Sequence, residues 1–127
     1  MNATETTTSA PHLTPLLGRI VGFVDTEEQL ENVLQALQRV RFARSKITVF
    51  RGESGLNAVE ELKHEIHMGE DERELVSFCS SELKEGHIGI EVEVQNQTEA
   101  RLVSETATSH QARHFTYFGP WYTMRCT

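Results

Sequence analysis

The feature that most constrains this chain is a strand–helix–strand unit that occurs twice, once near each end. The first unit runs from Gly18 to Gly52 and the second from Gly86 to Gly119, which are spans of 34 and 33 positions (52 − 18 and 119 − 86). In both, an apolar strand precedes a helix-capping signal, an apolar helical stripe and a short strand. This repeat predicts an internal duplication of the split βαβ type, with four antiparallel strands and two helices on one face of the sheet.

The first unit begins with residues 16–24, which are apolar on both sides and predict a strand covered on two faces. Asp25 and Glu28 have the spacing of a capping box at the start of the next helix. The apolar stripe of that helix is Leu30, Val33, Leu34, Leu37 and Val40. A short β-branched strand over residues 46–50 closes the unit.

The second unit contains the clearest strand pattern, because residues 86–94 alternate between apolar and polar side chains. The set expected to face the helices is Ile88, Ile90, Val92 and Val94. The set expected on the opposite face is His87, Gly89, Glu91 and Glu93. Asn96 and Glu99 then give a second capping signal before a helix.

The predicted domain covers residues 16–122, since a chain of 127 residues is long enough for one domain of ordinary size. Residues 1–15 are rich in Thr and Ser and predict a disordered tail, and residues 123–127 are expected to be a C-terminal tail. Residues 56–85 are a helical acidic insert between the units; nine acidic and three basic residues lie within 60–85. These inserted helices are expected to cover one edge or end of the sheet.

Charge and cysteine content limit the function classes. Twelve basic and 19 acidic residues give a net charge of −7, which argues against a nucleic-acid-binding protein. No apolar run approaches the roughly 20 residues that cross a bilayer, and the N-terminus lacks the pattern of a secretory signal. Cys79 lies on an apolar helical stripe, as buried thiols do, and it forms no CxxC pair with Cys126. A reducing cytoplasm is therefore the expected compartment.

Four segments together resemble a known family: residues 18–25 (Gly-Arg-Ile-Val-Gly-Phe-Val-Asp), 42–49, 86–94 and 114–121 (His-Phe-Thr-Tyr-Phe-Gly-Pro-Trp). Over residues 17–122 the chain is similar to small bacterial proteins described as general-stress or heat-induced stress proteins. The resemblance implies a ferredoxin-like α+β domain, here a two-layer sandwich with inserted helices between its halves. It also implies a stress-linked context, and its structural motifs supply no catalytic residue.

A basic segment gives the first candidate site, for an anion such as a phosphate. It leads into a glycine loop expected between a strand and a helix, where backbone amides and guanidinium groups bind anions. The candidate residues are Arg44, Lys46, Arg51, Gly52, Ser54 and Gly55. Glu53 opposes an anion there, and the alternative is a helix C-terminus and a turn with solvated arginines.

Two histidines give a candidate metal site, because His64 and His67 are three positions apart and share a helix face near Glu60. The alternative is a pair of polar histidines on an acidic surface, and no cofactor is expected. Glu91 and Glu93 share one face of a strand about 7 Å apart, which suits a carboxylate pair. Solvent exposure explains these two glutamates more simply, and no catalytic residue is predicted.

Aromatic residues near the C-terminus predict an interface between subunits. Five of the nine aromatic side chains lie there: Phe115, Tyr117, Phe118, Trp121 and Tyr122. The expected interface, on the sheet face away from the helices, consists of Phe23, Phe115, Tyr117, Trp121 and Tyr122. A two-fold homodimer would bury this face. The alternative is a monomer whose C-terminal segment folds back over its own sheet.

These observations lead to hypotheses about function from different classes. The first is a non-enzymatic regulatory or protein-interaction module, linked to stress, that works as a homodimer in a bacterial cytoplasm. The second is an anion- or nucleotide-sensing domain that uses the basic segment. An enzyme on the same ferredoxin-like frame is a third hypothesis, for which the sequence marks no catalytic set.

Overall fold

The structure is a computed structural model in which residues 18–62, 70–118 and 123–126 are described. This part of the chain contains five strands and four helices, with a 3₁₀ turn at Arg44–Lys46. In chain order the elements are β1 (Arg19–Val24), α1 (Glu27–Arg39), β2 (Ile47–Phe50), α2 (Gly52–Leu62), α3 (Glu70–Lys84), β3 (Ile88–Glu93), α4 (Gln97–Thr108), β4 (Arg113–Phe118) and β5 (Thr123–Cys126).

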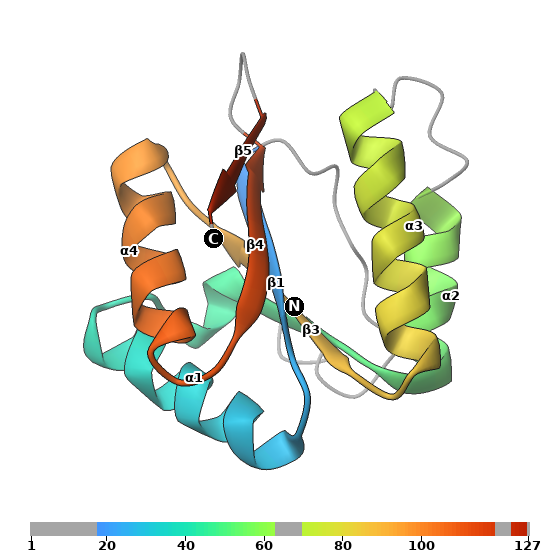
Figure 1. Cartoon of the computed structure of the whole chain (residues 1–127). Coiled ribbons are helices and arrows are strands. Elements are labelled where there is room, and N and C mark those ends of the chain that lie inside the picture. Colours follow the sequence, from blue (N-terminus) through green and yellow to red (C-terminus); the bar gives the residue numbers. More distant parts are fainter. Residues whose placement is uncertain (1–17, 63–69, 119–122, 127) are drawn as a thin grey trace.

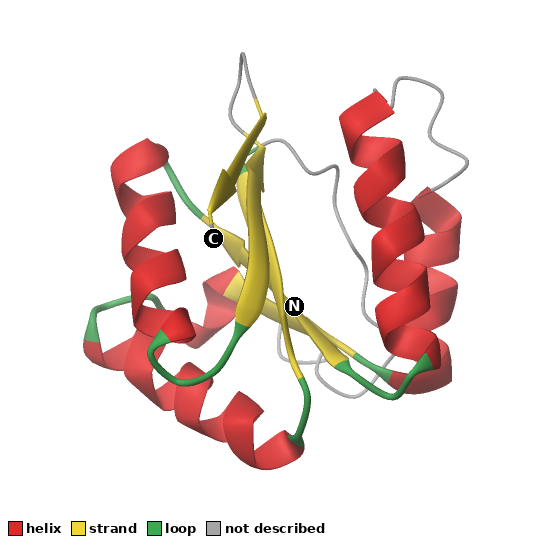
Figure 2. Cartoon of the chain, viewed as in Figure 1, coloured by secondary structure: helices red, strands yellow, loops and turns green. Residues whose placement is uncertain are grey.

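The strands form one sheet in the order β2-β3-β1-β4-β5 (Figures 1 and 2), and all neighbouring strands are antiparallel. The prediction of an α+β protein with an antiparallel sheet is thus confirmed. The prediction of a C-terminal tail over residues 123–127 is wrong for Thr123–Cys126, because these residues pair with β4 as an edge strand. The tail predicted over residues 1–15 lies outside the described residues.

One face of the sheet, called the first face, packs against α1 and α4 (Figure 2). Helical spacing turns the apolar stripes of both helices onto the sheet. The buried helix residues include Leu30, Val33, Leu37, Ala100, Val103 and Ala107. They meet the apolar set that strand alternation assigns to this face, which is Ile88, Ile90, Val92 and Val94. The first-face core thus lies between two layers, the sheet and the pair of helices α1 and α4.

The opposite face, called the second face, is covered by α2 and α3, which together are called the inserted helix pair (Figure 1). The strand side of this smaller core consists of Val21, Phe23, Phe50 and Phe118. The helix side consists of Ala58, Val59, Leu75, Val76, Cys79 and Leu83. The inserted helices therefore add a layer on the second face, and the expectation that they cover an edge or end of the sheet is wrong.

The inserted helix pair leaves and rejoins the sheet at nearly the same point. Phe50, the last residue of β2, lies directly opposite Gly89 near the start of β3. Two antiparallel neighbours with this register are ordinarily joined by a turn of two to five residues. Residues 51–88 thus stand in place of a short turn between β2 and β3.

The two first-face helices, α1 and α4, begin with the same kind of cap. Thr26 Oγ1 accepts the Gln29 N–H at 3.1 Å, and Asn96 Oδ1 accepts the Glu99 N–H at 2.9 Å. The two caps are 70 positions apart (96 − 26). The corresponding glycines of the two units are 68 positions apart at the start (86 − 18) and 67 at the end (119 − 52). The capping box predicted at Asp25 is displaced by one residue, because Thr26 is the cap.

The C-terminal turns of α1 and α4 repeat at the same distance. Both helices end through a residue with positive φ, Arg41 at 79° and Gln111 at 76°, again 70 positions apart (111 − 41). In both turns the next residue's N–H reaches back to a helix carbonyl: Phe42 bonds to Leu37, and Ala112 bonds to Ala107. This is the Schellman pattern, which ordinarily uses glycine at the positive-φ position.

Candidate functional site

The candidate functional site is the second face together with the inserted helix pair, because buried polar groups gather there. Cross-strand register arranges the sheet residues in rows, which are Phe50–Gly89–Phe23, Thr48–Glu91–Val21 and Glu93–Arg19. Along β2, β3 and β1 the second face therefore changes from an apolar row to a charged row. β4 continues the apolar row with Arg113 and the charged row with Phe118. Glu91 lies in the middle row, between an apolar side chain and a threonine.

Aromatic contacts close the apolar end of this face. The Phe23 ring meets the Phe50 ring edge-to-face at a centroid distance of 6.2 Å and the Phe78 ring of α3 at 5.5 Å. Phe78 in turn meets the His114 ring of β4 at 5.1 Å. These contacts hold α3 against β1 and β4.

Glu91 is the unusual group of the site, because its side chain is only 5% exposed. Its Oε1 lies 3.9 Å from Arg19 Nε, which is longer than a hydrogen bond. In the described part of the chain, its Oε2 is the one buried side-chain polar atom to which no group donates. Burial raises the pKa of Glu91 to about 7; Arg19 acts in the opposite direction, and Glu93 adds to the rise.

Cys79 lies on the helix side of the same core and is buried. Burial raises the pKa of its thiol strongly, and the nearby carboxylates of Glu82 and Glu91 raise it further. A thiol held neutral is a poor nucleophile. The expectation of a buried, structural Cys79 is confirmed by its position.

A second polar group, called the end cluster, consists of Asp25, Glu82, His87 and Arg113. It lies where β1 ends and where β3 and β4 begin. The Arg113 guanidinium donates to Asp25 Oδ1 and, at 2.6 Å, to Glu82 Oε1. His87 Nδ1 lies 3.0 Å from Glu82 Oε1, and His87 Nε2 lies 3.5 Å from Asp25 Oδ1. Because Glu82 belongs to the last turn of α3, the end cluster ties the inserted helix pair to the sheet.

A β-bulge in β4 brings Arg113 to the end cluster. Val21 pairs with Thr116, whereas Phe23 pairs with Arg113, so three steps of β4 match two steps of β1. His114, within the bulge, has a positive φ of 60°. Without the extra residue, strand alternation would place Arg113 on the first face.

The end cluster is not arranged as a metal site. Its two carboxylates approach different nitrogens of the His87 ring, and the Arg113 guanidinium lies between them. Among the described residues, no group of three or more His, Cys, Asp and Glu side chains is placed to hold a metal ion. The predicted metal ligands His64 and His67 lie outside the described residues.

The segment predicted to be a glycine loop is helical instead, because Gly52, Ser54 and Gly55 belong to the first turn of α2. The need for glycine at position 55 is steric. A Cβ there would lie 2.9 Å from the Phe50 carbonyl carbon, so the glycine allows α2 to begin directly against β2.

The basic residues of that prediction do not meet around one point. Arg51 pairs with Glu27 of α1, with Nε 2.8 Å from Oε2. Arg44 donates from Nη1 to the Ile47 carbonyl oxygen at 2.6 Å, at the start of edge strand β2. Lys46 lies in the 3₁₀ turn before that strand. The alternative, a turn with separately placed basic side chains, describes this segment.

The predicted interface residues are mostly inside the chain's own cores. Phe23 is 0% exposed on the second face, and Phe115 and Tyr117 are each 1% exposed on the first face. These three side chains are therefore not an exposed docking surface, because the helices of the same chain already cover them. Trp121 and Tyr122 lie outside the described residues.

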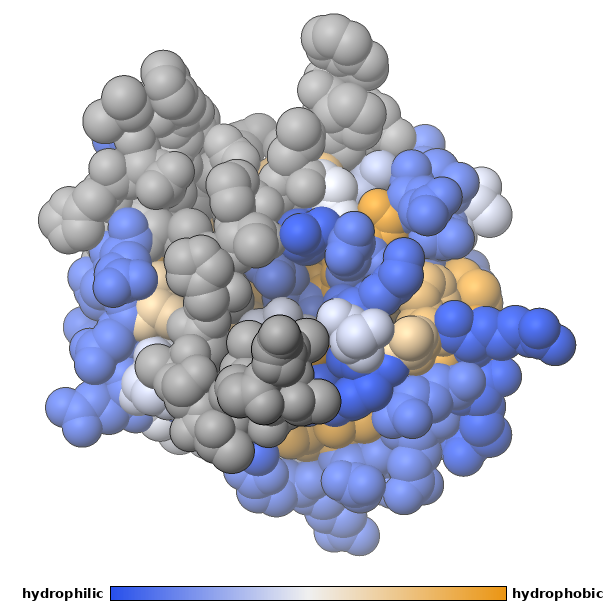
Figure 3. Space-filling model, turned by 180° about the vertical axis from the view of Figure 1, so that it is seen from behind, coloured by the Kyte–Doolittle hydropathy of each residue, from blue (hydrophilic) through white to orange (hydrophobic). Residues whose placement is uncertain are grey.

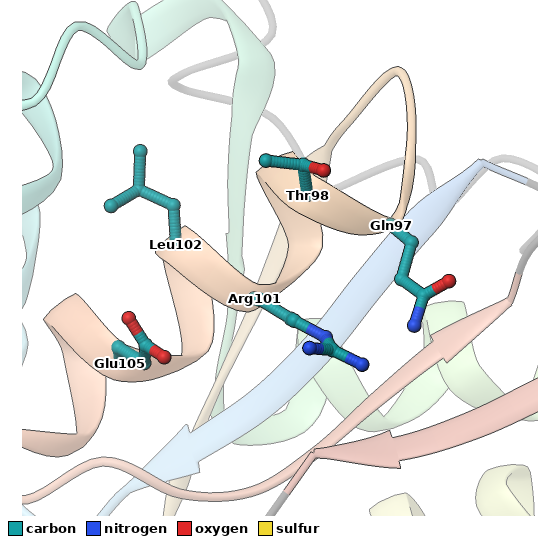
Figure 4. A pocket seen from close by; sticks show the side chains of 5 residues that line it. All are labelled: Gln97, Thr98, Arg101, Leu102 and Glu105. Carbon is teal, nitrogen blue, oxygen red and sulfur yellow. The ribbon is translucent and has the colours of Figure 1, made fainter.

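A shallow hollow lies on the outer side of α4 and is lined by Gln97, Thr98, Arg101, Leu102 and Glu105. Its two charged side chains, Arg101 and Glu105, point in different directions (Figure 4). Seen from behind, most of the described surface is hydrophilic, with smaller hydrophobic areas between (Figure 3). Among the described residues, neither the hollow on α4 nor the surface seen in Figure 3 contains a buried polar atom without a hydrogen-bond partner, as Glu91 does.

Two features of the site are absent from the sequence-based predictions. The alternation around Glu91 places this residue correctly on the face opposite α1 and α4, but nothing local shows that the inserted helix pair covers it. Arg113 and Glu82 are 31 positions apart and meet only because of the bulge. The glycine neighbour of Glu91, Gly89, is the one local signal of close packing on that face.

No protein-family model, no curated protein and no solved structure matches this chain. Within the residues that the structure describes, no helix has both the length and the apolar character needed to span a membrane. The geometry of the second face is therefore the basis for the functional conclusion.

Proposed function

We propose that this protein is a non-enzymatic regulatory module that acts in a bacterial cytoplasm under stress, by covering or releasing the second face of its sheet. When the inserted helix pair is released, a second copy of the chain docks on that face. The observation that carries the proposal is the cover itself, an inserted segment that buries an apolar sheet face together with an unsatisfied carboxyl group. The stress context rests on the resemblance to general-stress proteins.

The topology supports a ferredoxin-like assignment for the underlying domain. Without the inserted helix pair and β5, the strand order is β4-β1-β3-β2, with α1 and α4 as the crossover helices on one face. That order follows from two interleaved βαβ units, as the split βαβ type requires. Domains of this kind have one sheet face free of their own helices, and here the insertion occupies it.

The second face is suited to a second copy of the chain by its charges. Arg19 Nη1 lies 3.8 Å from Glu93 Oε2, and both groups border the apolar core. In a two-fold dimer through this face, Arg19 of one copy would pair with Glu93 of the other, so the same kind of ion pair would form between subunits as within one. A patch that carries both partners of its own ion pair is self-complementary, as a two-fold interface requires.

The test loosens the cover without changing the sheet. Val76 of α3 is 2% exposed in the second-face core, and Val103 of α4 is 0% exposed in the first-face core. Val76→Ala and Val103→Ala remove the same atoms from equally buried helix positions on opposite faces. We expect Val76→Ala to raise the dimer fraction several-fold at a given concentration, as measured by light scattering, because it weakens only the cover.

Val103→Ala is the matched control and should leave the dimer fraction unchanged at equal loss of stability. If the wild type and both variants keep the monomer mass of 14.4 kDa across micromolar concentrations, release for self-association is excluded. If Val103→Ala dimerises as much as Val76→Ala, general destabilisation rather than the second face explains the association.

A further inference from the structure

We infer that the charge of Glu91 controls the cover: a neutral carboxyl keeps the inserted helix pair on the sheet, and an ionised carboxylate favours its release. The inference rests on the proposed function, because it concerns the regulation of the same face. It follows from where Glu91 lies, on the central part of the sheet and directly beneath the added layer.

The geometry makes the charged form costly only when the cover is in place. With the inserted helix pair docked, Glu91 Oε2 is buried and receives no hydrogen bond. A buried carboxylate without donors is strongly disfavoured, whereas a neutral carboxyl in the same place is disfavoured far less. Removal of the helices exposes Glu91 to water, where the charge is solvated. Ionisation and release are therefore linked.

The groups that face Glu91 do not cancel this cost. From β1, Arg19 approaches to 3.9 Å at the border of the core, which favours the charged form. On β3 itself, Glu93 disfavours the charged form. From α3, the Cys79 thiol is neutral, and Glu82 is held in the end cluster by Arg113. On α2, Glu60 accepts a hydrogen bond from Ser80 of α3 at 3.2 Å. The charges that act on the pKa of Glu91 are those of Arg19 and Glu93.

The direction of the pH effect follows from the two states. The pKa of Glu91 is about 7 with the cover in place and returns toward 4.5 when the carboxyl is solvated. Below pH 4.5 the carboxyl is neutral in both states, so the covered state keeps its full stability relative to the released state. As the pH rises from 4.5 to about 7, that stability falls. Acid therefore closes the cover, and neutral to alkaline conditions loosen it.

The Cys79 thiol can report the release of the inserted helix pair. It lies on the side of α3 that faces the sheet, is buried in the covered state, and becomes reactive only on release. In a Cys126→Ser background, the rate of Cys79 alkylation by iodoacetamide is followed by intact mass between pH 5 and pH 8. The Cys79 alkylation rate of each protein is divided by the Cys79 alkylation rate of Glu91→Gln at the same pH. This division removes the pH dependence that comes from ionisation of the thiol in the released state. We expect this ratio to rise by roughly one to two orders of magnitude across the range.

Glu93→Gln is the matched control, because it removes the same charge from the same strand face, where the Glu93 side chain is 51% exposed. The ratio of its alkylation rate to that of Glu91→Gln should still rise with pH, but less than the wild-type ratio does, because Glu93 contributes to the raised pKa of Glu91. A wild-type ratio that stays constant with pH overturns the inference, as does a Glu93→Gln ratio that stays constant. If Glu91→Gln does not fold, a carbon NMR titration of the wild type decides, and titration of Glu91 in the ordinary range overturns the inference.

The outcome is separate from that of the proposed function. Self-association is read by light scattering, and release is read by Cys79 alkylation. A pH-controlled cover on a protein that stays monomeric supports the control by Glu91 and contradicts the proposed dimer. A dimer whose formation and Cys79 reactivity are independent of Glu91 supports the proposed function and overturns the control.

Discussion

The ring of Phe50 lies directly on the backbone of Gly89: a Cβ added at Gly89 would be 2.2 Å from Cε2 and Cζ of that ring. On the first face, Gly22 and Phe115 repeat the arrangement, with a Cβ–ring distance of 2.3 Å. In both places a strand glycine makes room for an aromatic ring of the neighbouring strand. The two glycines therefore decide how closely each core packs on the sheet.

Gly89→Ala should destabilise the protein by about 1–3 kcal/mol in urea denaturation, because the ring must move out of a packed core. Truncation of the ring by Phe50→Leu removes the clashing atoms. The double variant Gly89→Ala/Phe50→Leu should therefore lose less stability than the sum of the single variants, by at least about 0.5 kcal/mol.

Gly86→Ala is the comparison for that cycle, since a Cβ at Gly86 meets nothing within 4 Å but its φ is 88°. Its cost comes from backbone strain and should add to that of Phe50→Leu. Equal coupling of Phe50→Leu with both glycine variants would show that the close approach at Gly89 is not the cause.

Arg41→Gly should stabilise the protein by about 0.5–1 kcal/mol, because glycine adopts the positive φ at the end of α1 without steric cost. Gln111→Gly relieves the same strain at the end of α4. It also removes the Gln111 oxygen that accepts a hydrogen bond from Gln29 Nε2 at 2.8 Å, so its gain should be smaller. Thermal and urea unfolding of both variants measure the difference, and a larger gain from Gln111→Gly contradicts this account.

Arg113→Ala should cost more stability than Arg51→Ala, although each removes an arginine that binds a carboxylate. The Arg51 and Glu27 side chains are 48% and 64% exposed, so their pair contributes less than about 1 kcal/mol. Arg113 and Glu82 are 30% and 13% exposed, and the loss of Arg113 leaves Glu82 without its closest donor, at a cost of about 2 kcal/mol. Equal urea midpoints for the two variants contradict the assignment of the end cluster as the tie between α3 and the sheet.

The frame of the domain is predictable because it depends on local periodicity. The alternation from Ile88 to Val94 assigns each residue to the correct face, and the stripe of Leu30, Val33 and Leu37 identifies the side of α1 that packs. The acidic insert is predicted to be helical for the same reason. Such patterns describe what one element buries, and they do not say against which surface it packs.

The site is less predictable because it depends on docking and on an irregularity in a strand. A glutamate in an alternating strand indicates an exposed face, and only the position of the inserted helix pair makes Glu91 buried. The extra residue at the His114 bulge reverses the face of Arg113, which no period of two can anticipate. The glycine loop prediction fails at Gly55, where a helix begins and close contact with Phe50 requires the glycine.

The position of the insertion also has a consequence for the order of assembly. β3, α4 and β4 follow one another directly along the chain, whereas β2 reaches β3 only after residues 51–88 have been closed into a loop. The entropy lost on closing a loop rises with its length, so contacts that are local in sequence form before distant ones. α4 can therefore pack on β4 early. β3 and β4 join one sheet only when β1 comes between them, from 64 to 74 positions away in the chain (88 − 24 and 93 − 19), which is farther than β2 is from β3.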